Sequence, residues 1–365
     1  MVEKVKLSEI LKVKTGKYDA NHEDKNGEYD FFTCALKPCK TNTFSFDDEV
    51  IILPGNGANV GQVIYHNGKL EAYQRTYVLH EIKCNVKYLY YILKSNWKKH
   101  TLKNEVGSAT NYIKLAHITD FKIPFLDLNQ QNQIAKTLDK VNELIELRKE
   151  SITKLDTLAK SIFIDMFGDP VSNPKKWKIK KLKQLTDVKT GKTPSRDELL
   201  YWENGTELWA TTTEVNKRFI FDTQEKVTKY AVEKCKLTVY PENTILIAMY
   251  GQGKTRGNVV LLKAKSTINQ AFGAILSSEN IHQEFLLSLL KNSYSHIRSL
   301  GRGGNQENLN LDIVKNLDII NPPLDLQNKF SKIIEKIEEQ KTLYTQELEK
   351  LQNNFDALLQ KSFQE

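Results

Sequence analysis

The chain is 365 residues long, has a formal net charge of +8 and a mean hydropathy of -0.49. This length predicts two or three domains, and 40% hydrophobic residues are typical of a globular protein. No apolar run approaches the roughly 18 residues of a membrane helix, and the first residues lack the apolar core of a signal peptide. The cysteines form no C-x-x-C pair, so we expect free thiols and a cytoplasmic location. They are Cys34, Cys39, Cys84 and Cys235.

The first 125 residues mix strand-like and helix-like runs. We expect strands at Val50–Leu53, Gly61–Tyr65 and Thr76–Ile82 and a helix at Lys87–Trp97. A glycine-rich stretch, PGNGANVG, follows the first strand. The proline-containing turn at Ile123–Leu128 then leads into a long helix, because proline is tolerated at a helix start and not inside it.

A long helix is predicted from Gln130 to Phe167, because apolar residues recur there in steps of three and four. The predicted helix-packing positions are Ile134, Leu138, Val141, Ile145, Ile152, Leu155 and Ile162. Such a helix would be roughly 57 Å long at 1.5 Å per residue. It needs a packing partner, since isolated helices are held mainly by tertiary contacts.

A second long helix is predicted from Gln327 to Phe363, and each position of its seam lies 196 residues after its counterpart in the first. Its predicted packing positions are Phe330, Ile334, Ile337, Tyr344, Leu348, Leu351, Phe355 and Leu358. Two long helices that share one register at a fixed offset indicate an internal duplication.

The duplication extends to the segments before the helices. The pentapeptide VKTGK occurs at Val13–Lys17 and again at Val188–Lys192. The second copy has its own strand-like and helix-like runs at Thr244–Ala248, Asn258–Leu262, Ala271–Leu276 and Gln283–Leu300. The copies differ mainly after VKTGK, where the second carries the longer segment that includes Thr193–Val215. This pattern predicts that the two copies share one scaffold and differ in the surface segments that they carry.

We therefore predict an α+β fold with two duplicated α/β domains, residues 1–125 and 169–322, separated by two long helices, residues 126–168 and 323–365. If the helices pair within one chain, this order favours an antiparallel, pseudo-twofold coiled coil with one domain at each end. Pairing between chains is the alternative. The polar seam positions Arg148 and Lys341, with Tyr344, are expected to set the register or to receive another subunit.

Charge is distributed unevenly over these segments. Basic residues exceed acidic ones by 4 in residues 1–125 and by 7 in residues 168–322, whereas the two helical segments carry net charges of −1 and −2. Two basic domains on a stiff spacer suit a polyanion held at two places, such as duplex DNA read at two half-sites. Ordinary surface lysines explain the charge equally well.

The whole chain resembles the DNA-specificity subunits of type I restriction–modification enzymes. The resemblance rests on two variable domains, each closed by a segment such as LDLNQQNQI (Leu126–Ile134) or LDLQNKF (Leu324–Phe330) that leads into a long helix. TGKTPSRDELLYW, followed by Leu208–Ala210, also resembles the opening of a target-recognition domain. Many relatives have Glu-Gln where this chain has Gln130-Gln131 and Leu326-Gln327.

This resemblance implies a subunit without catalytic activity. Each target-recognition domain would read one half of a bipartite DNA site through the major groove, and the helices would act as spacer and as the dock for two methyltransferase subunits. Those subunits would bring S-adenosylmethionine and methylate adenine. Motor–nuclease subunits that use ATP and Mg could join them. No cofactor is expected on this chain itself.

Two motifs suggest enzymes, and we expect neither to be catalytic. AMYGQGKT (Ala248–Thr255) fits a relaxed P-loop pattern, yet the residues after it predict a strand, whereas a P-loop requires a helix there. NPPL (Asn321–Leu324) has leucine where amino-methyltransferases place a base-stacking aromatic ring. The seven histidines form no metal-binding pattern, so no metal site is expected.

Candidate DNA contacts are polar or basic residues on expected loops, since such side chains read bases and bind phosphates. In the first domain they are Asn56, Asn59, Gln74, Arg75, Lys98, Lys99, Asn111 and Lys114. In the second they are Arg196, Thr212, Thr213, Lys217, Arg218, Lys254, Arg256, Arg302 and Gln306. Gln74 recurs as Gln270 at the same offset, which fits a structural hydrogen bond equally well. Two other hypotheses are a two-headed coiled-coil adaptor for protein partners and a P-loop enzyme.

Overall fold

The computed structural model describes residues 3–103, 111–301 and 308–363. The chain divides into two compact units. Unit 1 consists of Met1–Glu150 and Tyr344–Glu365, and unit 2 is Ser151–Leu343. Each unit therefore combines one globular part with one half of each long helix, α4 (Leu128–Phe167) and α10 (Leu324–Phe363). Among the described residues, no helix is both long and apolar enough to cross a membrane.

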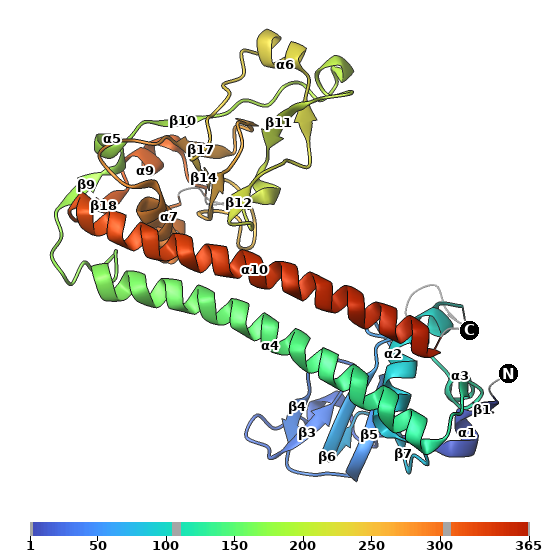
Figure 1. Cartoon of the computed structure of the whole chain (residues 1–365). Helices are drawn as coiled ribbons and strands as arrows, with labels where there is room; N and C mark the ends of the chain where they lie inside the picture. Colours follow the sequence, from blue (N-terminus) through green and yellow to red (C-terminus); the bar gives the residue numbers. More distant parts are fainter. Residues whose placement is uncertain (1–2, 104–110, 302–307, 364–365) are drawn as a thin grey trace. The chain divides into compact units, whose positions relative to one another are not determined.

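The globular part of unit 1 is built on a mixed sheet with one long helix, α2, packed against it (Figure 1). Its strands are β1 (Lys4–Lys6), β2 (Lys12–Thr15), β3 (Tyr29–Phe32), β4 (Cys39–Thr41), β5 (Phe46–Pro54), β6 (Ile64–Ala72), β7 (Thr76–His80) and β8 (Lys122–Pro124). Its helices are α1 (Leu7–Ile10), η1 (Ala20–His22), α2 (Val86–Lys103) and α3 (Leu115–Thr119). Six strands form one sheet in the order β2-β7-β5-β6-β3-β4, and β1 pairs with β8.

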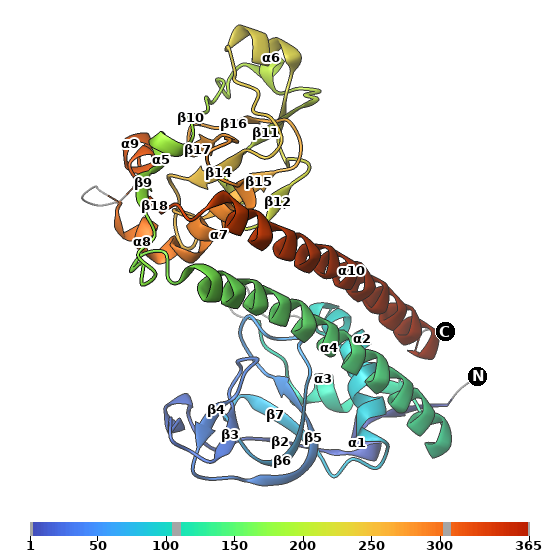
Figure 2. The same ribbon diagram turned by 60° about the vertical axis from the view of Figure 1, so that its left-hand side comes forward.

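The globular part of unit 2 repeats this topology with additions (Figure 2). Its strands are β9 (Ile179–Lys181), β10 (Val188–Thr190), β11 (Glu207–Ala210), β12 (Phe219–Ile220), β13 (Lys226–Val227), β14 (Ile245–Ala248), β15 (Val259–Leu262), β16 (Thr267–Ile268), β17 (Phe272–Ile275) and β18 (Asp318–Ile320). Its helices are α5 (Leu182–Leu185), η2 (Leu199–Tyr201), η3 (Thr212–Glu214), α6 (Lys229–Lys234), α7 (Gln283–Asn292), α8 (Tyr294–Ser299) and α9 (Leu311–Lys315).

The duplication predicted from the sequence is confirmed strand by strand. The order β10-β17-β14-β15-β12 in unit 2 matches β2-β7-β5-β6-β3 in unit 1, including the parallel pairing of β12 with β15 and of β3 with β6. Likewise, β18 pairs antiparallel with β9 as β8 does with β1. The longer segment of the second copy forms the separate three-stranded sheet β13-β11-β16, with η2, η3 and α6.

Several predicted boundaries shift in the structure: α2 extends to Lys103 and β5 starts at Phe46. Two further differences have a clear physical reason. The strand expected at Gly61–Tyr65 starts at Ile64, because Gly61 has a positive φ of 91° and belongs to the preceding turn. The strand then continues to Ala72 through polar residues that pair with β5, which hydrophobicity did not reveal. The helix expected at Gln283–Leu300 is interrupted at Ser293, whose ψ of 5° ends α7 and starts α8.

Within each unit, α4 and α10 pack against each other in antiparallel orientation. In unit 1, Leu138 and Ile145 share an apolar cluster with Phe355 and Leu359. In unit 2, the ring of Phe163 lies 5.6 Å from that of Phe330 between centroids. The predicted packing positions lie in these clusters except for Ile152, which is half-buried, and Tyr344. The helices thus pair within one chain.

Polar seam residues fix the register of this pairing. The guanidinium of Arg148 lies over the ring of Tyr344 at 4.0 Å from its centroid and pairs with Glu347 at 2.7 Å. Tyr344 is the duplicated equivalent of Arg148. In an antiparallel pair, equivalent positions meet at one point of the seam, and this contact is that point. In unit 2, Lys341 forms an ion pair with Asp156 of α4. A slip of one turn would separate these charges from their partners.

A duplicated buried glutamine joins each long helix to its globular part. Gln131 is 2% exposed, accepts a hydrogen bond from the backbone N of Asn85 at 2.9 Å, and donates to the backbone O of Leu126 at 2.8 Å. Gln327 is fully buried, accepts from the backbone N of His282 at 2.8 Å, and donates to the backbone O of Pro322 at 2.8 Å. Asn85 and His282 both cap a helix, α2 and α7, so each glutamine holds a helix start against a long helix.

Replacing this amide by an isosteric apolar group should destabilise unit 2. We expect Gln327→Leu to lower the free energy of unfolding by about 2–4 kcal/mol, because one buried N–H and one buried C=O lose their partners. Urea-induced unfolding followed by circular dichroism measures the change. The exposed Gln133→Leu on α4 is the control and should stay within about 0.5 kcal/mol of the wild type. Equal effects of the two substitutions would contradict a structural role for the buried amide.

The burial of His282 predicts that the start of α7 is sensitive to pH. Its Nδ1 accepts a hydrogen bond from the backbone N of Glu284 at 3.2 Å and lies 2.7 Å from the Ser331 hydroxyl oxygen. Burial lowers the pKa of the imidazole below its usual value of 6.5, and the Glu335 carboxylate opposes this in part. The unfolded chain therefore binds the proton first as the pH falls through 6.5, so stability that is present above this pH is lost below it.

The duplication supplies the substitution that tests this effect, because asparagine occupies the equivalent position at residue 85. His282→Asn keeps an acceptor for the backbone N–H and cannot be protonated. We expect its unfolding free energy to fall less than that of the wild type between about pH 7.5 and pH 5.5. The exposed His296→Asn should change the pH dependence far less. Identical pH profiles for wild type and His282→Asn would refute the assignment.

Candidate nucleic-acid interface

Three of the polar residues predicted to contact DNA lie around Cys34, which follows β3 in unit 1. The Oδ1 of Asn56 accepts a hydrogen bond from the Cys34 thiol at 2.8 Å, and the Nδ2 of Asn59 donates to the Cys34 carbonyl at 2.8 Å. Arg75 contributes its backbone O to the same thiol at 3.4 Å, and its side chain is exposed. The two asparagine amides thus hold the loop in shape and the Arg75 guanidinium extends into solvent.

The glycine-rich loop brings further predicted residues to this place. The backbone N of Gly57 donates to the carbonyl of Asn111 at 2.9 Å. A Cβ on Gly61 would lie 3.2 Å from the Cγ of Lys98, so the loop rests directly on α2 beside the exposed Lys98 and Lys99. Three separate segments that carry asparagine or lysine therefore lie next to one another. This surface offers both hydrogen-bonding groups and positive charge.

Two other predicted residues of unit 1 are exposed. Gln74 lies between β6 and β7, where its backbone N donates to the Tyr18 carbonyl at 3.0 Å. Gln270 occupies the equivalent exposed position before β17 in unit 2. Lys114 is exposed and directly precedes α3. The recurrence of glutamine at these two positions stays compatible with DNA contact or with a structural role.

In unit 2, the equivalent loop between β14 and β15 carries Lys254 and Arg256. Lys254 is exposed, and its backbone O accepts a hydrogen bond from the Tyr294 hydroxyl at 3.2 Å. Arg256 is 8% exposed, and its backbone O accepts from the Arg298 guanidinium at 3.3 Å. Tyr294 and Arg298 therefore support the loop from α8, and Lys254 is the basic side chain that the loop presents to solvent.

In the longer segment of the second copy, the side chain of Arg196 packs against two tryptophan rings. Its guanidinium lies 3.9 Å from the ring centroid of Trp202 and 4.9 Å from that of Trp209, and it pairs with Glu225. About half of its side chain stays exposed. An arginine held flat on two indole rings has little conformational freedom to lose on binding a ligand.

The other predicted residues of the insertion lie around η3. Thr212 is half-buried, and Thr213 and Lys217 are exposed. The Thr213 hydroxyl lies 2.7 Å from that of Thr211. The buried Glu214 accepts hydrogen bonds from two backbone N–H groups, those of Thr211 and Gln224, and so fixes this turn.

Arg218 holds unit 2 together internally. Its guanidinium pairs with Glu284 of α7 and, at 3.1 Å, with Glu338 of α10, and its side chain is 16% exposed. This placement favours a structural role over contact with DNA, which the sequence did not reveal. Burial raises the pKa of Glu284 against the opposing charge of Arg218. Burial and the Arg218 charge together lower the pKa of the neighbouring Lys291 to about 8.

The remaining predictions, Arg302 and Gln306, lie outside the described residues. The DNA contacts proposed from sequence thus stay predictions. The structure gathers Asn56, Asn59, Arg75, Lys98 and Asn111 near one loop cluster and leaves Gln74 and Lys114 on separate turns.

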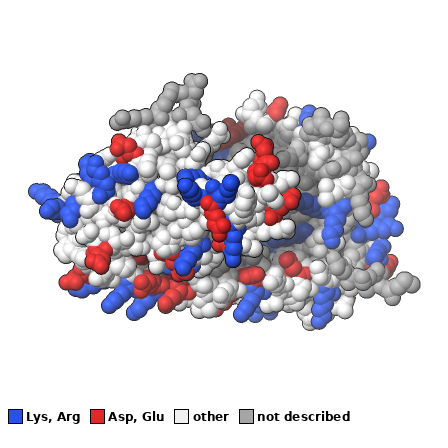
Figure 3. All heavy atoms as spheres, turned by 90° about the horizontal axis from the view of Figure 1, so that it is seen from above, with Lys and Arg blue, Asp and Glu red and all other residues white. Residues whose placement is uncertain are grey.

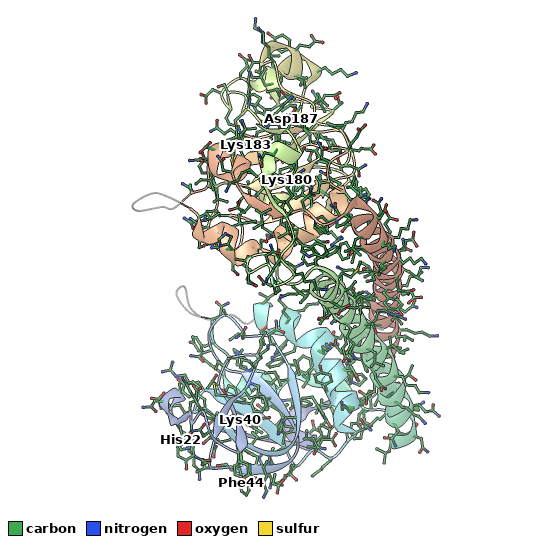
Figure 4. The ribbon with its side chains drawn as sticks, turned by 90° about the vertical axis from the view of Figure 1, so that its left-hand side faces the viewer. His22, Lys40, Phe44, Lys180, Lys183 and Asp187 are labelled. Atoms are coloured by element: carbon green, nitrogen blue, oxygen red, sulfur yellow. The ribbon has the colours of Figure 1, made fainter. Side chains whose placement is uncertain are left out.

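A basic and aromatic surface in unit 1 was missed by sequence reasoning. His22, Lys40 and Phe44 are labelled in Figure 4. The His22 Nε2 lies 2.8 Å from the hydroxyl of Thr43, which precedes Phe44, and Lys40 belongs to β4. The Lys69 amine lies 4.6 Å from the Phe44 ring centroid, and 43% of the Phe44 side chain is exposed. These residues are separated in the sequence and meet through the pairing of β3 with β4 and β6. No spacing in the sequence could have indicated this cluster.

In unit 2, Lys180 and Asp187 flank α5, and Lys183 lies within it (Figure 4). Lys183 and Asp187 line a polar groove of about 340 Å³. On the face drawn in Figure 3, Lys and Arg side chains are interspersed with Asp and Glu side chains. Charge on that face alone therefore does not mark a binding surface.

Two motifs that resemble parts of enzymes lie in other structural settings here. The P-loop-like stretch leads from β14 directly into strand β15, and no helix N-terminus follows it to hold a phosphate. Pro322 and Pro323 precede the first residue of α10, which makes NPPL the helix-entry turn that the sequence predicted. Residues 3–103, 111–301 and 308–363 contain no group of three His, Cys, Asp or Glu side chains that could hold a metal ion.

Known proteins share both the sequence and the fold. Residues 1–157 and 174–353 match the family model of the type I restriction modification DNA specificity domain. The chain is 37% identical over 156 residues to the type I restriction enzyme EcoDI specificity subunit of Escherichia coli. That match covers 43% of this chain and 34% of the relative, so the chain spans about a third of that protein's length. It is 25% identical to the MjaIX specificity subunit of Methanocaldococcus jannaschii, over 75% of this chain and 67% of that one.

Solved structures extend the likeness to the whole chain. The S subunit of a type I restriction–modification system from M. genitalium superposes with a TM-score of 0.69 and 19% identity, covering 100% of this chain and 96% of that one. A chain from a structure of the type I R-M system matches with a TM-score of 0.58 and 14% identity, covering 99% and 97%. At these identities the likeness shows the fold. The duplicated fold, together with the family match over nearly the whole chain, leads to one conclusion: this protein belongs to the type I restriction modification DNA specificity family.

Proposed function

We propose that this chain is the non-catalytic DNA-reading subunit of a type I restriction–modification complex. Each globular part would act as a target-recognition domain for one half of a bipartite site. The observation that carries the proposal is the family match on a chain that repeats one fold twice with different loops. A shared scaffold keeps the orientation of each domain on its helix, and different loops allow two different half-sites.

The side chains available on the loops support this role. The cluster around Gly57 and Gly61 offers asparagine amides that can pair with base edges and lysines that can bind phosphates. In unit 2, the exposed Lys254 occupies the equivalent loop, and the insertion adds Arg196 on its aromatic support. The two domains would thus present different chemistry on the same framework.

The helices would serve as spacer and as dock. Each contains 40 residues, which corresponds to roughly 60 Å of helix. Partners would be two methyltransferase subunits that carry S-adenosylmethionine, and possible further motor–nuclease subunits that use ATP and Mg. The apolar side chains of Leu144 and Leu147 on α4, each about half exposed, fit such a dock. A coiled-coil adaptor for proteins alone is the alternative, and it predicts no DNA binding.

Comparison of the methylated bases in a host with and without this gene tests the proposal directly. We expect one bipartite methyladenine motif to disappear with the gene. An unchanged set of motifs, in cells shown to contain the protein and its methyltransferase, would overturn the proposal.

The basic loop surface predicts the salt dependence of DNA binding. For the reconstituted complex on duplex DNA, we expect Lys98→Gln combined with Lys99→Gln to reduce the slope of log affinity against log salt by about 1.8, since each lost phosphate contact removes about 0.9. Fluorescence anisotropy across a salt series measures the slope. The same change at the exposed Lys329 and Lys332 of α10 is the control. A slope that does not respond to the α2 substitutions would remove these lysines from the interface.

The spacer role predicts how helix length changes the DNA motif. One heptad inserted after Lys149 in α4, and one after Thr345 in α10, keeps the apolar seam in phase and adds about 10.5 Å. We expect the spacer between the half-sites to lengthen by about 3 base pairs, with both half-sites unchanged. Sequencing of methylated DNA identifies the new motif. Replacement of an existing heptad without a change in length is the control, and an altered half-site would show that the helices do not set the spacing.

A further inference from the structure

Unit 2 contains a basic cavity that the proposed reading of DNA does not use. Its volume is about 520 Å³, and it lies between α4, α7, α8, α10 and the segment that joins η3 to β12. Among the described residues, its lining contains four basic side chains and one carboxylate, those of Lys160, Arg218, Lys291, Lys341 and Asp156. Positive charge therefore dominates the cavity.

The equivalent place in unit 1 is filled by large apolar side chains. Tyr91 and Phe355 are both buried there, and their ring centroids lie 5.9 Å apart. Ile145 is buried in the same apolar cluster. These three side chains pack α2 against α4 and α10.

The duplication identifies what replaces Tyr91 in unit 2. Tyr91 lies six residues after Asn85, and Ser288 lies six residues after His282, the equivalent of Asn85 at the start of α7. Ser288 lines the cavity. A buried phenol ring in unit 1 thus corresponds to a small hydroxyl group in unit 2.

The long helices show two matching replacements. At their common offset of 196 residues, Ala159 of α4 is the equivalent of Phe355, and Lys341 of α10 is the equivalent of Ile145. Both Ala159 and Lys341 line the cavity. Two apolar side chains of the unit 1 cluster are therefore replaced by a small one and a charged one on the same scaffold.

These replacements work against the stability of unit 2. A cavity in place of packed apolar side chains loses buried apolar area and the contacts that surrounded it. Departures from close packing in an otherwise consistent fold are expected at sites that serve a function. The chemistry of the cavity lining then indicates which ligand the site would hold.

Two of the four cations already have carboxylate partners. Arg218 pairs with Glu284 and, at 3.1 Å, with Glu338. Lys341 pairs with Asp156 across the two long helices. These pairs hold the walls of the cavity together and leave little of their charge for a ligand.

Lys291 is the buried cation without such a partner. Its amine forms no hydrogen bond or ion pair with the residues that the structure describes. Burial, followed by the charge of Arg218, lowers the pKa of this amine to about 8, although the carboxylates of Glu284 and Glu338 oppose this. The surrounding protein therefore compensates the charge of Lys291 incompletely.

The equivalent lysine of unit 1 is placed differently. Lys94 lies nine residues after Asn85, as Lys291 does after His282. The Lys94 amine lies 5.4 Å from the ring centroids of both Tyr90 and Phe355. In unit 2 the ring of Phe355 is replaced by the methyl group of Ala159, so the cavity takes the place of this aromatic neighbour.

We propose that this cavity binds a phosphate group, supplied by a small phosphorylated compound or by the backbone of DNA. A phosphate ester carries about two negative charges at neutral pH, which would compensate Lys291 and the exposed Lys160. The exposed Asn216 and Ser295 add neutral hydrogen-bond donors to the lining. The volume of the cavity is in the range of small-molecule sites. The site stands on this geometry and does not rest on the proposed function.

Inorganic pyrophosphate is a suitable probe, because it presents phosphate groups and nothing else. We expect isothermal titration calorimetry with the full-length protein to show one site with a dissociation constant on the order of 100 µM. The titration is done in about 0.15 M salt, where interactions among exposed surface charges are screened.

The duplication supplies a matched pair of lysine variants. Lys291→Met removes the buried charge and should weaken pyrophosphate binding at least about tenfold, since a charge-assisted contact is lost. Lys94→Met makes the same change at the equivalent position of unit 1 and should leave binding unchanged.

Unit 1 also supplies side chains that fill the cavity. Ala159→Phe combined with Ser288→Tyr introduces the residues that unit 1 has at these positions. This double variant should abolish pyrophosphate binding. Its thermal unfolding midpoint should not fall below that of the wild type, because apolar contacts replace open space. The midpoint also shows whether the variant is folded.

The outcomes decide the proposal. Binding that is lost in the double variant, weakened in Lys291→Met and retained in Lys94→Met supports the phosphate site. No saturable binding, or equal weakening in both lysine variants, overturns it.

Competition with duplex DNA identifies the source of the phosphate. Displacement of pyrophosphate by DNA assigns the site to the DNA backbone, and unchanged binding in the presence of DNA assigns it to a small compound. The methylated motif of the host tests DNA reading separately. A failed phosphate site is therefore distinguished from a failed DNA-reading function.

Discussion

The antiparallel packing of α4 on α10 is the constraint on which the rest of the structure depends. Neither helix could stay ordered over 40 residues as an isolated rod, because most helical stability comes from the burial of an apolar face. In unit 1 the contact closes around Leu138, Ile145 and Phe355, and in unit 2 around Phe163 and Phe330. Each globular part then shares its hydrophobic core with this helix pair.

Because the two units are duplicated copies, each attaches its globular part to the long helices in the same way, although some of the residues involved differ. Both use a buried glutamine to hold the start of a helix against α4 or α10. Beyond that they diverge. Unit 1 joins Tyr91 to Asp139 through a hydrogen bond of 2.6 Å, whereas unit 2 bridges Glu284 and Glu338 with Arg218. Conserved geometry with changed partners is the result expected when a scaffold is kept while its surface evolves separately in each copy.

The candidate interface shows how much of a site residue types can reveal. Loop asparagines and lysines were identified from the sequence, and the fold brings Asn56, Asn59 and Lys98 to one place. Arg218 carries the same charge as these lysines, yet the fold places it between two carboxylates. The cluster of His22, Lys40 and Phe44 forms only through pairing of strands that are distant along the chain. Residue type alone therefore does not reveal that Arg218 faces a neighbouring helix while Lys98 faces solvent.

The sequence by itself determined the two long helices, their common register and the repeat of the globular parts. These features depend on periodicity and local turn signals, which are visible in consecutive residues. The tertiary structure decided the rest: the partner of each seam residue, the break at Ser293, and the start of β6 after Gly61. These outcomes depend on contacts between residues far apart in the sequence, where burial and charge are set by neighbours that no local pattern names.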